Sequence, residues 1–164
     1  MTVRAEIRPA DELLPAFDFH WDAETEILAG RCAVAASRGG FTGSVELESP
    51  EGAVLLLEAE GGVLSGVEVV VWPDPERPQR LVAPHDAVPG RVVLLPPEPS
   101  ATLVEMDAPI AVATPPNETL VHLTFGGPRA RTVRVASNVL VELDAHDRVV
   151  GLWLLDLPPF PGAG

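Results

Sequence analysis

The sequence predicts an all-β protein made of two similar antiparallel β-meander units, packed as a pseudo-symmetric sandwich or barrel. Three observations support this fold class. Short apolar runs recur about every 8–12 residues with turn residues between them. No segment shows the 3.6-residue apolar period of a helix. The 164-residue chain also contains 18 prolines, which disfavour helices. A chain of this length normally forms one domain with a buried core.

The apolar runs define the expected strands. In the first half they are Ser44–Leu47, Ala53–Ala59 and Val63–Trp72, separated by the turn sequences SPEG and EGG. In the second half they are Thr119–Phe125, Arg131–Ala136, Val139–Asp144 and Val149–Leu157, separated by FGGPR, ASN and DAHDR. One helical turn is expected at Pro9–Leu14, because a proline followed by acidic residues suits a helix start.

A proline-rich stretch separates the two halves. Eight prolines lie between Pro73 and Pro99, and each removes a backbone donor and biases the preceding residue towards an extended conformation. We therefore expect a non-helical connection over residues 74–102, with one short strand at Arg91–Leu95.

The two halves resemble each other. AVLLLEAEGGVLSGVEVVVWP (Ala53–Pro73) and VLVELDAHDRVVGLWLLDLP (Val139–Pro158) both contain a strand, an acidic turn, a glycine and a second strand that ends at a proline. Gly66 and Gly151 correspond in this comparison. The pattern predicts a tandem duplication within one compact domain. Its parts are an N-terminal segment (1–16), a first β repeat (17–73), the connection (74–102) and a second β repeat (103–160).

The second half also resembles a known family. The residues that carry the resemblance are Glu118–Leu123, Thr132–Val135, Val139–Asp144, Val149–Gly151 and Leu152–Asp156. This succession is similar to the family of small bacterial domains of unknown function numbered 2283, closely over 117–159 and more weakly over 17–73. The resemblance implies a small, mainly antiparallel sheet that pairs with another copy, and it transfers no catalytic residue.

The chain departs from that family at three positions. His146 and Asp147 stand in the turn where the family usually has glycine or asparagine, and His122 replaces a strand tyrosine. Histidine and aspartate tolerate a left-handed turn less well than glycine, but better than most residues.

Charge and composition exclude several functions. The 24 acidic residues outnumber the 11 cations, all of them arginine, and give a net charge of −13. Without lysine or tyrosine the chain has no Schiff-base lysine, P-loop lysine or tyrosine nucleophile. The acidic balance argues against a nucleic-acid or anionic-membrane partner. The missing residue types use AT-rich codons, which indicates a bacterial genome rich in GC.

The sequence predicts a cytoplasmic protein. The N-terminal sequence MTVRAEIRPADELLP lacks the apolar core of a signal peptide, and no apolar stretch is long enough for a transmembrane helix. Cys32 is the only cysteine, so no intrachain disulfide forms.

Two sets of residues could form chemical sites. His20, Asp22 and Glu24 alternate, so on a strand they would share one face and could bind a divalent metal; the alternative is a solvent-facing turn. Cys32 could act as a nucleophile only beside an imidazole, and otherwise it is a core residue of the buried strand that the sequence GRCAVAAS (30–37) predicts. Its candidate partners are His20, His85, His122 and His146.

The arginines and the tryptophans suggest contacts and not catalysis. Arg129, Arg131 and Arg134 form the only local cation cluster, and we expect them to pair with acids on a neighbouring strand. The aromatic residues Trp72, Trp153 and Phe160 lie near strand ends, where they would contribute either to the core or to a subunit or partner interface.

The sequence favours a non-catalytic structural or protein-interaction module, with a homodimer or another protein as partner. It assigns no catalytic residue, cofactor or metal. One alternative is a small-molecule- or metal-binding β-barrel, enzymatic if its histidines converge. Another is an acidic inhibitor or immunity-type protein that masks a basic partner through its charge.

Overall fold

Alternating burial along the strands builds two sheets. The computed structural model describes residues 3–10, 13–33 and 39–161, and in this part of the chain it contains fourteen strands and no helix. In β5 (Val54–Glu60), Leu55, Leu57 and Ala59 are buried, whereas the residues between them are half-buried. Successive side chains of a strand point to opposite faces, so this pattern gives each sheet a core face and an outer face.

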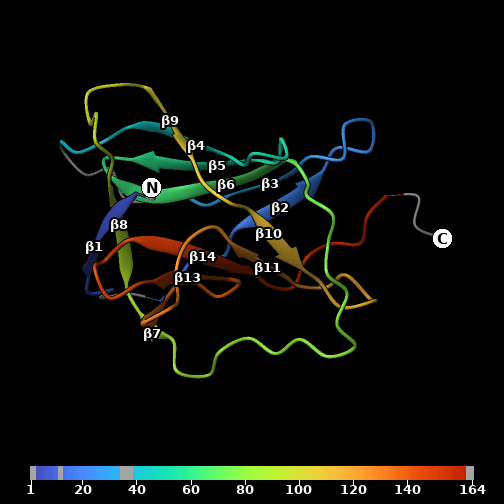
Figure 1. Ribbon diagram of the computed structural model, residues 1–164. Coiled ribbons are helices and arrows are strands. Elements are labelled where there is room, and N and C mark those ends of the chain that lie inside the picture. Colours follow the sequence, from blue (N-terminus) through green and yellow to red (C-terminus); the bar gives the residue numbers. More distant parts are fainter. Residues whose placement is uncertain (1–2, 11–12, 34–38, 162–164) are drawn as a thin grey trace.

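The first sheet has eight strands and curls into a half-barrel (Figure 1). Its main path runs β1-β8-β6-β5-β4-β9, and β3 joins β6 beside β8 and carries β2. Besides β5, its strands are β1 (Arg4–Arg8), β2 (Asp18–Trp21), β3 (Leu28–Arg31), β4 (Gly43–Glu48), β6 (Val63–Val71), β8 (Arg91–Leu95) and β9 (Leu103–Asp107).

The second sheet has six strands in the order β10-β11-β14-β13-β12-β7. Its strands are β7 (Val88–Pro89), β10 (Ala111–Ala113), β11 (Val121–Thr124), β12 (Arg131–Ala136), β13 (Val139–Leu143) and β14 (Val149–Leu154). All strand pairs in both sheets are antiparallel except β4 with β9 and β7 with β12.

The two sheets share one strand order, as a duplication would produce. The path β2-β3-β6-β5-β4 in the first sheet corresponds to β10-β11-β14-β13-β12 in the second, and each path ends with one added parallel strand. Gly66 lies opposite Glu58, and Gly151 lies opposite Glu142, in the corresponding strand pairs. A Cβ atom on either glycine would overlap the facing carboxylate, and at Gly151 it would also overlap the backbone carbonyl of Leu123, so the requirement for glycine is strictest at Gly151.

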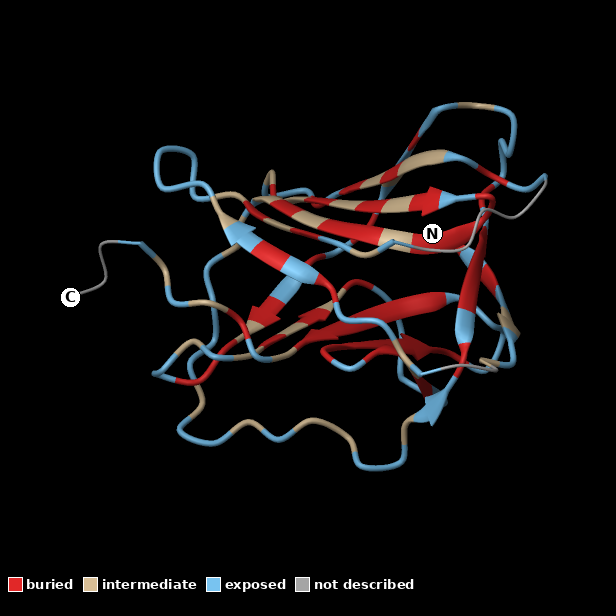
Figure 2. Ribbon diagram, turned by 180° about the vertical axis from the view of Figure 1, so that it is seen from behind, coloured by how far each residue is buried: buried red, intermediate tan, exposed pale blue. Residues whose placement is uncertain are grey.

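The core lies between the sheets (Figure 2). Leu47, Leu55 and Leu57 of the first sheet and Leu123 and Leu152 of the second have no exposed surface and belong to one continuous cluster. Each fully buried leucine contributes about 1.5–3 kcal/mol through the hydrophobic effect. Branched and small side chains thus supply most of this core, with only a few phenylalanines.

The proline-rich connection is more than a linker. It runs along the side of the six-stranded sheet that faces away from the core and supplies β7 and β8 (Figure 1). Leu140 and Trp153 lie outside the central core cluster but are 0% and 4% exposed, respectively. The two central strands of the six-stranded sheet, β13 and β14, are therefore buried on both faces.

The predicted strands match the structure closely. The predictions at Arg91–Leu95 and Arg131–Ala136 coincide with β8 and β12, and those over the longer apolar runs differ from β4, β5, β6, β11, β13 and β14 by at most three residues at either end. The strands β1, β2, β7, β9 and β10 were not predicted, and the strand predicted at GRCAVAAS (30–37) overlaps only the last two residues of β3. The helical turn expected at Pro9–Leu14 includes residues 11–12, which lie outside the described residues.

Candidate functional site

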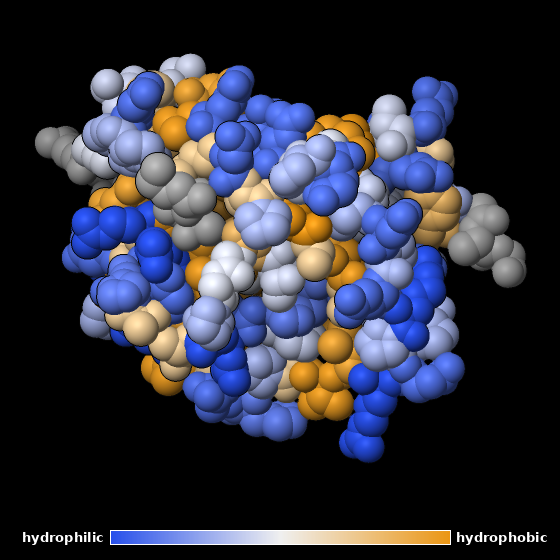
Figure 3. Space-filling view, viewed as in Figure 1, coloured by the Kyte–Doolittle hydropathy of each residue, from blue (hydrophilic) through white to orange (hydrophobic). Residues whose placement is uncertain are grey.

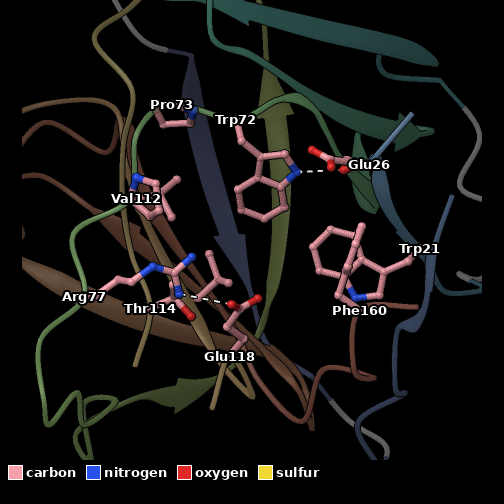
Figure 4. A pocket seen from close by; sticks show the side chains of 11 residues that line it. Trp21, Glu26, Trp72, Pro73, Arg77, Val112, Thr114, Glu118 and Phe160 are labelled. Atoms are coloured by element: carbon pink, nitrogen blue, oxygen red, sulfur yellow. Dashed lines mark hydrogen bonds and ion pairs between the residues drawn. The ribbon is translucent and has the colours of Figure 1, made fainter. Parts of the chain in front are cut away.

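A pocket of about 300 Å³ lies where the ends of the two sheets meet (Figure 4). Trp21 at the end of β2 and Trp72 just after β6 come from the eight-stranded sheet, whereas Val112 in β10 comes from the six-stranded sheet. Phe160 reaches the pocket from the segment after β14. We call this feature the aromatic pocket.

Strand register explains why the two tryptophans meet. β3 pairs antiparallel with β6, with Leu28 opposite Val69, so the turn before β3 and the residues after β6 lie at the same edge. In that turn the Asp22 carboxylate accepts hydrogen bonds from the backbone N–H groups of Glu24 and Thr25. These backbone bonds hold the pKa of Asp22 below its ordinary value.

The aromatic rings pack with defined geometry. Trp21 stacks on Trp72 with 5.6 Å between ring centroids, and it meets Phe160 edge-on at 5.1 Å. All three side chains are only half-buried, whereas the other five aromatic side chains of the chain are buried. The incompletely buried aromatic surface of the protein is therefore gathered at this pocket.

The indole N–H groups of Trp21 and Trp72 already donate hydrogen bonds within the protein. Trp21 donates its Nε1–H to the carbonyl of Pro158, and Trp72 donates its own to the carbonyl of Glu26, each over 2.9 Å. What the indoles offer a ligand is therefore their apolar and negatively polarised ring faces.

Two carboxylates stand at the rim of the aromatic pocket. Glu118 pairs with Arg77 at 3.0 Å, and the Glu26 carboxylate has no partner among the described residues. Both glutamates have positive φ, 63° for Glu26 and 54° for Glu118, in the turns that precede β3 and β11. Figure 4 shows Arg77 and Glu118 on the opposite side of the pocket from Trp21.

A second polar cluster surrounds Glu142 on the outer face of the six-stranded sheet. The Glu142 side chain is 7% exposed, and His122 contacts its Oε1 at 2.7 Å while Trp153 donates to its Oε2 at 3.2 Å. The His122 ring stacks on Trp153 with 4.0 Å between centroids, and the Arg129 guanidinium lies 3.7 Å from Oε2. Every oxygen of this buried carboxylate is thus paired, as buried charges require.

Opposing effects act on the pKa of Glu142. Burial acts to raise it, but the hydrogen bonds from His122 and Trp153 and the charges of His122 and Arg129 outweigh burial and lower the pKa below the ordinary value. This satisfied and closed arrangement is typical of a structural cluster and leaves no open position for a substrate.

The proposed metal ligands do not converge. His20 contacts Asp18 at 3.1 Å, and Asp22 is occupied by the backbone of its own turn. Within residues 3–10, 13–33 and 39–161, no group of three histidine, cysteine or acidic side chains is arranged to hold a metal ion. The turn interpretation of Asp22 and Glu24 describes the structure.

The histidines do not assemble around the cysteine. His20, His85, His122 and His146 lie on four different segments, and no hydrogen bond or ring contact joins any two of them or links one to Cys32. Cys32 directly follows β3 and is half-buried, and burial raises the pKa of its thiol. A raised pKa disfavours the reactive thiolate. The buried strand predicted for GRCAVAAS continues into residues 34–38, outside the described residues.

Two of the three clustered arginines pair with acids. Arg129 reaches Glu142 on the neighbouring strand, whereas Arg131 pairs with Asp147 in the turn between β13 and β14. Arg134 instead donates to a backbone carbonyl of its own hairpin. These cations are engaged and form no open anion site.

Acidic side chains dominate the outer face of the eight-stranded sheet. They include Glu46, Glu48, Glu58, Glu68, Glu105 and Asp107, and the strand register places Glu46 beside Glu105. Figure 3 shows hydrophilic groups over most of the visible surface, with apolar groups in separate patches. This distribution favours solubility, and we assign no site to it.

The sequence predicted these sites only in part. Trp72, Trp153 and Phe160 were predicted together, but Trp153 lies beneath His122 and away from the pocket. Trp21 and Glu142 were not predicted. The glutamate inside the apolar run VLVEL was the available signal for a buried, paired carboxylate, but no local pattern indicates that Trp21 meets Trp72.

Comparison with known proteins gives no identity. No protein-family model matches the chain, and no curated protein matches it. The similarity to the domains of unknown function therefore stays a prediction. The described part of the chain contains no helix long and apolar enough to cross a membrane.

Proposed function

We propose that this protein is a non-catalytic interaction module that holds a side chain of a partner protein in the aromatic pocket. The observation that carries the proposal is the convergence of Trp21, Trp72 and Phe160, the only aromatic side chains of the described chain that are not buried. Tryptophan is enriched at the energetic centres of protein interfaces because it provides a large, rigid contact area.

The size and position of the pocket support this role. A volume of about 300 Å³ is at the lower limit of ligand sites, which suits one side chain better than a large cofactor. The pocket lies between the ends of both sheets, where the turn before β3, the connection and the C-terminal segment meet. A partner bound there would contact several parts of the chain at once.

NMR spectroscopy tests the proposal. N-acetyl amino-acid amides bearing apolar, aromatic, cationic and anionic side chains are titrated while the three indole N–H signals are followed. At least one amide should shift the Trp21 and Trp72 signals and leave that of buried Trp153 unchanged. The Phe160→Ala variant should weaken this binding, whereas Leu13→Ala, at a side chain 98% exposed and outside the pocket lining, should not. No response to any amide would refute the proposal.

The inhibitor hypothesis has one observation in its favour, the acidic outer face of the eight-stranded sheet. A basic partner attracted by a net charge of −13 would bind with a strong dependence on salt. The enzymatic alternative needs converging histidines, and the four histidines lack such an arrangement.

A further inference from the structure

We propose that the side chain held in the aromatic pocket is an arginine of a basic partner protein. This inference rests on the proposed function and adds the chemical class of the ligand. A guanidinium group is planar, stacks on aromatic faces, and carries a positive charge that carboxylates neutralise. The aromatic pocket offers both kinds of contact in one place.

The ring faces of the pocket favour a cation. Because Trp21 and Trp72 direct their N–H groups to backbone carbonyls, the pocket presents much aromatic surface, and its one cation, Arg77, is paired with Glu118. An anionic ligand, such as a carboxylate or phosphate, would have to compete with Glu118 for Arg77. A cation is drawn to the negative face of an indole, and arginine more often than lysine forms such contacts.

The rim carboxylates favour a guanidinium as the cation. Glu26 lines the pocket, is exposed, and has no partner among the described residues, so its two oxygens can accept the parallel hydrogen bonds of a guanidinium. Glu118 already holds the Arg77 guanidinium at 3.0 Å on the other side. The chain thus contains one arginine–carboxylate pair in the pocket and the free carboxylate for a second.

The net charge of the protein also favours a cationic ligand. A net charge of −13 attracts basic proteins and repels acidic ones. A neutral sugar or an apolar side chain could also stack on tryptophan, but neither would gain from the charge or from Glu26. The test below separates these occupants.

The decisive comparison uses arginine and its neutral isostere. N-acetyl-arginine amide and N-acetyl-citrulline amide have nearly the same shape, and only the first is charged. We expect arginine amide to bind at the Trp21 and Trp72 signals about 3- to 30-fold more tightly than citrulline amide, and more tightly than lysine amide. The advantage over citrulline should shrink at high salt.

Two variants locate the charge contacts. Glu26→Gln should weaken arginine binding several-fold, and Glu24→Gln, an exposed glutamate in the same turn that does not line the pocket, should not. Arg77→Ala should strengthen binding, because it frees the Glu118 carboxylate and removes a competing cation. Thermal unfolding establishes that each variant is folded before its binding is compared.

The outcomes separate the two proposals. If apolar or aromatic amides bind at the pocket and arginine binds no better than citrulline, the arginine inference is wrong and the pocket remains an interaction site. The inference is also wrong if Arg77→Ala weakens arginine binding or if a neutral sugar binds while arginine does not. If no probe binds, both proposals fail.

Discussion

At the scale of single residues, Glu142 is a buried charge that stabilises the sheet because its carboxylate is fully paired. Its carboxylate is held by Trp153 on the neighbouring strand β14 and by His122 on β11, one strand further, and the absent side chain of Gly151 makes room for it. The corresponding Glu58 lies opposite Gly66 but pairs with Arg31, whose side chain is 73% exposed. The same glutamate–glycine pair is therefore buried in one sheet and half-buried beside an exposed arginine in the other.

Neutralising Glu142 should cost much more stability than neutralising Glu58. Glu142→Gln keeps the side-chain size but removes the charge that strengthens both hydrogen bonds, so the free energy of unfolding should fall by about 1–3 kcal/mol. Glu58→Gln should cost at most about 1 kcal/mol, because its partner Arg31 is exposed and ion pairs open to solvent contribute little. Urea unfolding at neutral pH measures both values. Equal losses would contradict the structural role assigned to the Glu142 cluster.

The lowered pKa values of Glu142 and Asp144 predict an acid-labile fold. For Asp144, burial acts to raise the pKa, but backbone hydrogen bonds from Arg148 and His146 and the Arg148 side chain outweigh it. A carboxylate with a lower pKa in the folded state stabilises the fold above its unfolded pKa, about 4, and loses that contribution as the pH falls further.

The free energy of unfolding should therefore decrease as the pH falls below about 4. The difference between the wild type and Glu142→Gln should narrow over the same range, because protonation removes the charge that the variant lacks. Urea unfolding at a series of pH values measures both trends. A constant difference down to pH 3 would show that the charge of Glu142 contributes nothing.

At the scale of elements, the turns decide how the two β units meet. Asn138, in the turn between β12 and β13, accepts a hydrogen bond from the Phe17 N–H and donates one to the Phe17 carbonyl, each over 2.8 Å. The neighbouring Ser137 N–H donates to the Pro15 carbonyl. These hydrogen bonds hold the segment before β2 against the six-stranded sheet.

Asn138→Ala should destabilise the protein by about 2–4 kcal/mol, because it leaves both backbone groups of buried Phe17 without partners. The matched control is Asn117→Ala, which removes an exposed asparagine that bonds only within its own turn and should cost less than about 1 kcal/mol. Chemical unfolding monitored by circular dichroism gives both values. If Asn138→Ala lowers the free energy of unfolding no more than the control does, the Asn138 hydrogen bonds do not hold this segment in place.

Elements with strong local patterns were predictable, and those created by long-range pairing were not. Apolar runs such as Val63–Val71 carry their strand signal within themselves. β9 (Leu103–Asp107) is mostly exposed and contains two acidic residues, and it becomes a strand because β4 pairs with it in parallel. β7 is two residues long and contains a proline, so only its place beside β12 defines it.

The candidate site was partly predictable for the same reason. The sequence places Trp72 and Phe160 near strand ends, but the meeting of Trp21 with Trp72 depends on the pairing of β3 with β6. The hydrogen bond from Trp21 to Pro158 joins residues 137 positions apart. Nothing local in the sequence specifies a contact across that distance.

At the scale of the whole molecule, the two units exchange segments. β9, which leads into the second unit, pairs with β4 of the first, and the Phe17 backbone is held by Asn138 of the second. β8 of the connection also joins β1 to β6. Neither unit has a complete set of neighbours without the other, although their strand orders correspond.

This exchange predicts a single cooperative unfolding transition. If the halves were independent domains, a change in one sheet would split the transition, because only the damaged half would unfold early. Asn138→Ala should instead move the whole transition to lower urea concentration. Circular dichroism, which reports strands of both sheets, and tryptophan fluorescence, which reports the aromatic pocket and Trp153, should give the same midpoint. Separate midpoints for the two signals would show that the sheets unfold independently despite the strands they share.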